Sequence, residues 1–284
     1  MTDQGYLPGC FVGLCTVDPS YVVSEFPAPN QKVSASRQEL SVGGPATNAA
    51  ITFAFLGGAA SLVTALGVHA LAAIAREDLW KHKVKLHDLS ADPLAAPALS
   101  SICVHAATGD RTIVSANAAA QSALPGKFDP EALSGAKILL VDAHHMPLCI
   151  AAARAARDAG ITVVMDGGSW KEGMEGLLPF VDIAICSEDF TPPTKLRDLV
   201  VAKIAITRGA KPILWSTGES DGEIPVRLIQ PKDTSGAGDI FHGAFCWAYA
   251  SGYEFTKALE FASGVATESC LHYGTRSWMS RQQS

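Results

Sequence analysis

The sequence has little charge, no paired cysteines and no long basic run. Of its 284 residues, 48% are hydrophobic and 18% are charged, and the formal net charge at pH 7 is −6. Nucleic acids and anionic membranes attract clustered lysine and arginine, so the composition disfavours both as main partners. So many apolar residues in a chain of this length predict a folded globular protein with a full-sized core.

The seven cysteines show no Cys-x-x-Cys pair and no His/Cys cluster at metal-ligand spacing. Reduced thiols in a cytoplasm are the simplest interpretation, and we therefore expect a cytoplasmic protein. His144, His145 and His242 also lack such a cluster, which leaves only a weak case for metal binding or acid–base chemistry there.

Residues 43–75 contain no charged side chain and resemble a membrane span on a hydropathy scan. The pair Gly57-Gly58 interrupts this run, and Asn48, Thr52 and Thr64 dilute it. A buried helix, a turn and a buried strand therefore fit the segment better than a transmembrane helix does.

Three common kinds of site are unsupported. There is no Gly-x-x-x-x-Gly-Lys-Ser/Thr, which excludes a Walker-type kinase, and no Gly-x-Gly-x-x-Gly followed by a ribose-binding acid, which excludes a dinucleotide turn. No strand-to-helix elbow of the Gly-x-Ser-x-Gly type is expected, because Gly218-Glu-Ser-Asp-Gly222 lies between two expected strands, and a hydrolase of that type is therefore unsupported.

Apolar strand-like runs alternate with helical patterns, which predicts an α/β protein with a parallel sheet covered by helices on both faces. We expect strands at 9–17, 60–66, 137–141, 161–165, 183–186, 203–207, 213–216 and 226–229, and helices at 49–56, 70–81, 147–159, 174–178, 240–250 and 256–272. Short β-like pieces at 21–42 and strands at 100–105 and 111–115 are expected to form a separate small sheet.

The stretch Asp233-Thr-Ser-Gly-Ala-Gly-Asp239 opens directly into a predicted helix. Gly236 and Gly238 let backbone N–H groups face a ligand, and the start of the helix adds free N–H groups and the positive end of its dipole. This predicts an anion site. Asp239, at its edge, suits a base that takes a proton from a hydroxyl attacking phosphorus.

A second glycine turn, Gly43-Gly44-Pro45, precedes another predicted helix and is followed by Asn48. A buried amide is costly without a partner, so a polar ligand is expected there. Asp18 follows a predicted strand. Its position fits either a ligand contact beyond the strand end or a turn-starting Asp before Pro19.

Together, these residues resemble a known family. The stretch 233–245 is similar to the C-terminal signature of the ribokinase-like (pfkB) carbohydrate kinases, and Gly43-Gly-Pro-Ala-Thr-Asn-Ala-Ala50 is similar to their N-terminal signature. The resemblance covers nearly the whole chain. It implies one Rossmann-like three-layer α/β/α kinase domain over 1–284 with a small β-sheet lid, whose strands come from about 19–42 and 98–116. It also implies transfer of the γ-phosphoryl group of ATP to a sugar hydroxyl.

By the same resemblance, Asp239 matches the catalytic base, and Gly236, Ala237 and Gly238 match the anion hole for the transferred phosphoryl group. The positions that match sugar-binding residues are Asp18, Gly43, Gly44 and Asn48. The positions that match the ATP site are Thr207, Gly209, Ser235, Gly238, Cys270 and Gly274.

The sequence departs from the family pattern at three places. Relatives usually carry Gly-x-Asp-x-x-Gly where this chain has Gly67-Val-His-Ala-Leu-Ala72, and small residues where it has Lys211-Pro212. The Asn-x-x-Glu segment associated with magnesium is replaced by Ser187-Glu-Asp-Phe190, so Glu188 or Asp189 is the substitute expected to support Mg²⁺. A monovalent cation, K⁺, is a further expectation near Asp233 and Ser235.

The segments 166–171 and 261–270 resemble the ketose-kinase side of the family, which includes fructokinase, ketohexokinase and sulfofructose kinase. We therefore expect phosphorylation of a primary hydroxyl of a ketose or ketose derivative. The alternatives are a nucleoside or other small-molecule kinase of the same fold, and an inactive sugar-binding member. A homodimer that pairs through the lid is also expected from the resemblance.

Overall fold

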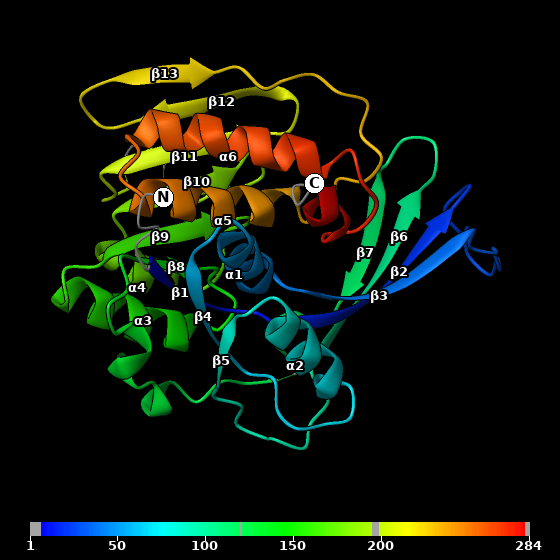
Figure 1. The fold of residues 1–284 in the computed structure, drawn as a ribbon, viewed down its shortest axis with the longest axis horizontal. Helices are drawn as coiled ribbons and strands as arrows, with labels where there is room; N and C mark the ends of the chain where they lie inside the picture. Colours follow the sequence, from blue (N-terminus) through cyan, green and yellow to red (C-terminus); the bar gives the residue numbers. More distant parts are fainter. Residues whose placement is uncertain (1–6, 120, 195–198, 282–284) are drawn as a thin grey trace.

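Two β-sheets organise the chain (Figure 1). The computed structural model describes residues 7–119, 121–194 and 199–281. The larger sheet has nine strands in the order β13-β12-β11-β10-β9-β8-β1-β4-β5. All neighbouring pairs from β11 to β5 are parallel, whereas β12 pairs antiparallel with both β11 and β13. Its strands are β1 Pro8–Val12, β4 Ala59–Thr64, β5 Lys85–Asp88, β8 Ile138–Val141, β9 Thr162–Gly167, β10 Ile183–Ser187, β11 Lys203–Arg208, β12 Lys211–Ser216 and β13 Asp221–Ile224.

Helices cover both faces of this sheet, as the alternating pattern predicts (Figure 1). Successive strand residues face opposite cores: Leu140 packs with the layer of α1, α5 and α6, and Leu139 with the layer of α3 and α4. The helices are α1 Pro45–Phe55, α2 Ala72–Lys81, α3 Met146–Asp158, α4 Met174–Leu177, α5 Ala237–Ala250 and α6 Phe255–Ser269, with short 3-10 segments at 117–119, 125–127, 130–133, 178–180 and 277–281. The expected three-layer fold is confirmed.

The smaller sheet projects to one side of the body (Figure 1). Its strands are β2 Thr16–Val23, β3 Arg37–Gly43, β6 Ala98–His105 and β7 Arg111–Ser115, in the order β3-β2-β6-β7. Two antiparallel hairpins, β2–β3 and β6–β7, meet through the parallel pair β2–β6. We call this sheet the lid. The two sequence segments expected to combine into one small sheet do so.

Some expected strands are wrong in detail. The run 9–17 divides into β1 and β2, because the Asp142 carboxylate fills the space beside Gly13 and the chain passes there into the lid. Asp18 therefore lies within a lid strand and not at the end of a central strand. Residues 226–229 form no strand, and the last strand is β13 instead. Strand β5 was not expected, because Lys-Leu-His-Asp offers almost no apolar pattern.

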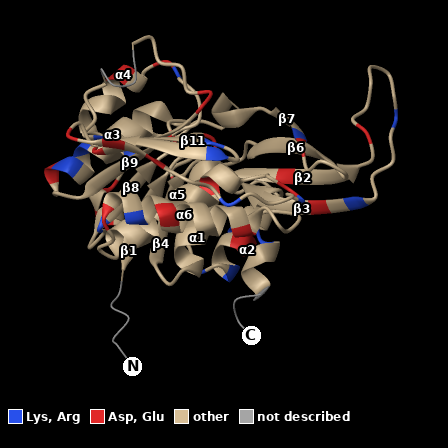
Figure 2. Ribbon diagram, turned by 90° about the horizontal axis from the view of Figure 1, so that it is seen from above, with Lys and Arg blue, Asp and Glu red and all other residues tan. Residues whose placement is uncertain are grey.

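Across the ranges 7–119, 121–194 and 199–281, no helix has the length and apolar character needed to cross a membrane. The uncharged run at 43–75 instead supplies α1, β4 and the start of α2. Lys/Arg and Asp/Glu are interspersed along the ribbon and are not separated by sign (Figure 2).

Candidate active site

The loop 233–236 and the first turn of α5 form the centre of the site. Asp233 is buried, and its carboxylate joins the loop to the segment after α6. Its Oδ1 accepts from the Ser235 N–H at 2.8 Å and its Oδ2 from the Gly274 N–H at 2.8 Å. Gly236, the N-cap of α5, has φ of 68°, a left-handed conformation that favours glycine. The loop is therefore rigid where the free N–H groups of the helix begin.

Two cavities lie on opposite sides of this loop. The larger has a volume of about 420 Å³ and is lined by Thr234, Ala237 and Gly238, and the smaller, of about 200 Å³, by Asp233, Ser235, Gly236 and Asp239. Neighbouring loop residues thus face different cavities.

Asp239 faces the smaller cavity from the first turn of α5. Its Oδ2 accepts a hydrogen bond from the Asn48 Nδ2 at 2.7 Å. Burial, and then the nearby negative charge of Asp166, raise the pKa of Asp239 to about 6. The raised pKa makes this carboxylate a stronger base than an ordinary Asp, which suits abstraction of a hydroxyl proton.

The smaller cavity contains buried polar atoms without partners in the described structure: Thr16 Oγ1, Asp18 Oδ1 and Ser235 Oγ. Asp18 is 7% exposed, and burial raises its pKa to about 6. Because a buried polar atom without a partner is costly, these atoms indicate a hydroxyl-rich ligand. Among the described residues that line this cavity, none is lysine or arginine.

The glycine turn before α1 is held by a residue that sequence reasoning missed. Asp142, 1% exposed and just after β8, accepts from the N–H groups of Leu14 at 2.8 Å and Ala46 at 3.1 Å. Gly44 has φ of 96°, and a Cβ there would overlap with the Leu14 carbonyl. These constraints place Asn48 one turn into α1, toward Asp239. No local pattern marks Asp142, since its partners lie 96 and 128 residues away.

Of the expected ATP residues, Thr207, Gly209, Gly238 and Cys270 line the larger cavity. Apolar side chains complete its wall, among them Ile213, Val226, Ile229 and Phe241. From the lid, Arg111 reaches the loop, where its Nη1 donates to the backbone oxygen and the Oγ1 of Thr234, each at 2.7 Å. The cavity thus combines an apolar slot with a guanidinium and a helix N-terminus, which fits a base at one end and phosphates at the other.

Three expected residues lie elsewhere. Ser235 and Gly274 line the smaller cavity and not the larger one, because the Asp233 carboxylate binds both backbone N–H groups and draws them to its side of the loop. Glu188 lines neither cavity, and its carboxylate pairs with Lys211 Nζ at 2.9 Å. Within the described ranges, no group of three His, Cys, Asp or Glu residues is placed to hold a metal ion.

Three of the four residues expected to bind sugar line the same cavity. Asp18, Gly44 and Asn48 line the smaller cavity, and Gly43 packs directly against the Asp18 carboxylate. The family position missing after Gly67 is served by Asp88 at the end of β5, which accepts from the Gly67 N–H at 2.9 Å and pairs with Arg76. That loop is therefore held structurally without its usual Asp.

Three further residues lie around Asp239. Arg276 had no signal in the sequence, Asp166 entered only as part of the segment 166–171, and His242 only as a weak metal or acid–base candidate. Asp166 is the next-to-last residue of β9, and its Oδ2 lies 3.5 Å from His242 Nδ1. The other ring nitrogen of His242 lies 3.2 Å from the Ile185 carbonyl oxygen. Arg276 follows α6 and donates a hydrogen bond to Asn48 Oδ1. All three come from segments far apart in the chain.

Comparison with known proteins identifies the family of this chain. The model described as pfkB family carbohydrate kinase matches residues 9–190 and 193–282. The chain belongs to this family. Its members are ATP-dependent phosphotransferases, which confirms the expected activity class. A Bacillus subtilis (strain 168) ribokinase is 38% identical over 81 residues, 28% of this chain and 28% of that protein.

Two solved structures show the same kinase fold. A putative ribokinase from Agrobacterium tumefaciens has a TM-score of 0.84 and 25% identity, with 98% of this chain and 99% of that chain covered. An adenosine kinase from Sinorhizobium meliloti has a TM-score of 0.79 and 18% identity, with 98% and 99% covered. The pfkB fold alone therefore does not separate sugar from nucleoside acceptors.

Proposed function

We propose that this pfkB kinase transfers the γ-phosphoryl group of ATP to a primary hydroxyl of an uncharged monosaccharide, a ketose in the first instance, with Asp239 as the base. One observation carries the proposal: the loop 233–239 separates the two cavities, with Asp239 facing the smaller one and Ala237 and Gly238 facing the larger. A hydroxyl in the smaller cavity is thereby set beside a carboxylate and opposite an anion site.

The smaller cavity supports an uncharged, compact acceptor. Its volume of about 200 Å³ is below the roughly 300–1,000 Å³ of pockets for drug-sized ligands. Its free polar atoms are hydroxyls and the Asp18 carboxylate, which match sugar hydroxyls. The absence of lysine and arginine from its described lining disfavours a phosphorylated or sulfonated sugar, which would need a cationic partner.

The larger cavity supports ATP as the donor. The apolar wall would hold adenine near Cys270, and Thr207, Gly209 and the start of α5 would hold phosphates. Magnesium would neutralise phosphate charge when bound. Glu188 does not fit as its support, since that carboxylate is paired with Lys211. Potassium near Asp233, pairing of two chains through the lid and a cytoplasmic location stay predictions.

A coupled assay with ATP and magnesium tests the proposal against ketoses, sulfosugars, aldoses including pentoses, and nucleosides. The highest kcat/KM is expected for a neutral ketose. A nucleoside that outperforms every sugar would overturn the acceptor class, and sugar binding by calorimetry without any turnover would identify an inactive member.

A pentose is the second candidate acceptor, because the Bacillus relative that matches at 38% identity is a ribokinase. The same assay separates the two: a higher kcat/KM for ribose than for any ketose would favour the pentose. Both acceptors use the same cavity and the same base.

A further inference from the structure

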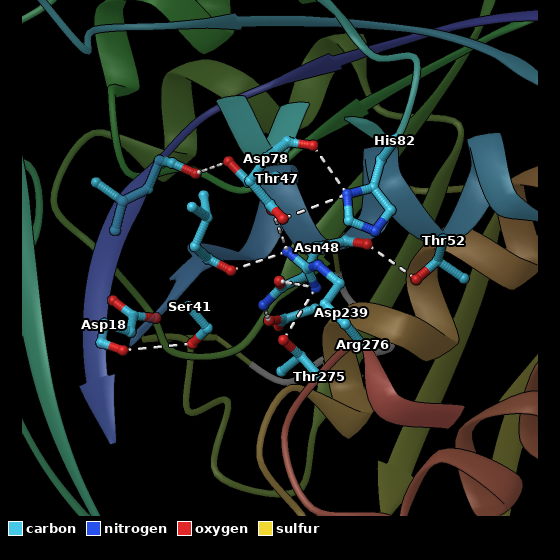
Figure 3. A network of polar contacts seen from close by, with 12 residues as sticks. Asp18, Ser41, Thr47, Asn48, Thr52, Asp78, His82, Asp239, Thr275 and Arg276 are labelled. Carbon is cyan, nitrogen blue, oxygen red and sulfur yellow. Dashed lines mark hydrogen bonds and ion pairs between the residues drawn. The ribbon is translucent and has the colours of Figure 1, made fainter. Parts of the chain in front are cut away.

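Arg276 contacts three separate elements next to Asp239 and Asn48 (Figure 3). Its Nη1 donates to Asn48 Oδ1 on α1 at 2.9 Å, and its Nη2 donates to the Val42 carbonyl on β3 at 2.8 Å. The same Nη2 lies 3.5 Å from Asp78 Oδ2 on α2. The side chain is 15% exposed and lines neither cavity, so its hydrogen-bond partners are protein atoms and not a bound ligand.

The Asn48 amide stands between Arg276 and Asp239 (Figure 3). Its Oδ1 accepts from Arg276 and its Nδ2 donates to Asp239 Oδ2 at 2.7 Å. An amide has one accepting and one donating end, and guanidinium only donates. The contact with Arg276 therefore permits only the orientation in which Asn48 donates to Asp239.

We propose that Arg276 is a positioning residue for phosphoryl transfer: it fixes the Asn48 amide, which in turn holds the Asp239 carboxylate toward the acceptor. This inference rests on the proposed function for its kinetic consequences. Its structural content, the control of Asp239 through Asn48, holds for any acceptor.

The consequence of losing Arg276 follows from the geometry. A freed amide can turn its Oδ1 toward Asp239, where two acceptors face each other and the ionised carboxylate loses a charge-assisted hydrogen bond. The titratable groups near Asp239 are Asp166 from β9, His242 from α5, Arg111 from the lid and Arg276. Only Arg276 acts on it through a fixed hydrogen-bonded intermediate in the described structure.

A simple charge effect is distinguishable from this orientation effect. Lysine at 276 keeps the positive charge but presents a single nitrogen, which cannot bridge Asn48, Val42 and Asp78 as the planar guanidinium does. Arg276→Lys therefore rescues fully if charge alone matters, and only partly if the amide must be oriented.

The experiment combines two readouts on Arg276→Met, Arg276→Lys, Asn48→Ala and the double variant Asn48→Ala/Arg276→Met. The first is the pH profile of kcat with the best acceptor. The second is titration of the Asp239 carboxyl by carbon NMR without substrates, assigned with Asp239→Asn. The matched control is Arg157→Met, an exposed arginine that donates to the Pro179 carbonyl at 2.6 Å, far from either cavity lining.

For Arg276→Met we expect the carboxyl midpoint and the acid limb to rise by about one pH unit. The plateau kcat is expected to fall on the order of tenfold because the base is misaligned. Arg276→Lys should recover part of both effects, and Arg157→Met should change neither. In the Asn48→Ala background, Arg276→Met should add little, since the interaction it acts through is gone.

Full rescue by lysine, or additive effects in the double variant, would overturn the proposal. An unchanged carboxyl midpoint in Arg276→Met would do the same. If Arg276→Met does not fold, Arg276→Lys with and without Asn48→Ala carries the same comparison. Wild-type protein that phosphorylates no sugar defeats the proposed function alone, because the NMR titration still decides the link from Arg276 to Asp239.

Discussion

Helices α1 and α5 begin alike and differ in what satisfies their first turns. Each follows a glycine at positive φ, Gly44 at 96° and Gly236 at 68°, and neither glycine can cap its helix with a side chain. At α1, the buried carboxylate of Asp142 accepts from Ala46 N–H, so this helix carries its own anion. At α5, the turn opens onto the larger cavity, lined by Ala237 and Gly238.

The same local motif therefore serves two purposes. An anion supplied by the chain makes the α1 turn a fixed support that presents Asn48. At α5 the start of the helix opens onto a cavity, where we propose that its N–H groups bind a ligand's anion, and Asp239 directly follows Gly238. Glycine turns at helix starts indicate anion sites only where the fold leaves their N–H groups without an internal partner. Four predictions examine this difference.

The largest expected effect is at the open turn. Asp239→Asn should lower kcat by about 10³-fold, because the acceptor hydroxyl loses its base while the anion site stays intact. A coupled assay measures kcat, and calorimetry should show that sugar and ATP still bind. Turnover at the wild-type level would refute the role of Asp239.

The next effect is at the filled turn. Asp142→Asn should lower the free energy of unfolding by about 3 kcal/mol, because Oδ2 serves Leu14 and Ala46, Oδ1 serves His144, and an amide in either orientation sets N–H against N–H. Urea denaturation measures this. The matched control is Asp182→Asn, where Oδ2 accepts only from Val163 N–H at 2.8 Å in the described structure. Equal losses for the two variants would contradict a special role for Asp142.

A second carboxylate near the α1 turn, that of Asp18, differs from Asp142 in having a free oxygen. Burial raises the pKa of Asp18 from 3.8 to about 6, so the folded state holds its proton more tightly than the unfolded state. Ionised Asp18 therefore costs stability above about pH 6 and costs nothing below pH 3.8. Asp18→Asn should be more stable than wild type by on the order of 2 kcal/mol at pH 8.

The same Asp18→Asn variant at pH 4 is the control, where thermal unfolding should show little difference from wild type. Its affinity for the acceptor should fall at pH 8, because a hydroxyl partner has changed. A stability gain that is equal at both pH values would show that burial of the charge is not the cause.

The smallest expected effect is that of Gly238→Ala, which should change ATP use without lowering stability. A Cβ on Gly238 meets no atom within 4 Å, so Gly238→Ala should leave stability unchanged or slightly higher, yet lower kcat/KM for ATP about tenfold by placing a methyl group at the anion site. The matched control is Gly264→Ala in α6, which is equally open and lines neither cavity. If the two variants keep the same activity, the α5 turn is not the anion site.

Much of the frame was predictable because its signals are local. Alternating strand and helix patterns gave the three layers, and the two glycine turns marked the helix starts that matter. The failures were long-range. Strand β5 has too few apolar residues to be recognised, and the division at Gly13 depends on Asp142, whose segment lies more than a hundred residues away.

In the candidate site, too, residues marked by local motifs were found, and contacts between distant segments were not predicted. Asp239, Gly238 and Asn48 were marked by motif, and the structure brings Asn48 and Asp239 into contact across 191 residues. Ser235 and Gly274 line the smaller cavity and not the larger one, because the side of the loop they face depends on the hydrogen bonds of Asp233. Glu188 was expected to support a metal ion, and its ion pair with Lys211 forms only once β10, β11 and β12 lie side by side in the sheet.

By itself, the sequence determined the layered fold and the chemistry class and marked Asp239 as the candidate base, because these depend on periodicity and on short motifs in which neighbouring residues act together. Only the tertiary structure decided which glycine turn is filled by Asp142 and which stays open, and which guanidinium orients Asn48. Those choices depend on side chains that meet only after the sheet has assembled, at separations of 96 residues for Ala46 and Asp142 and 228 for Asn48 and Arg276.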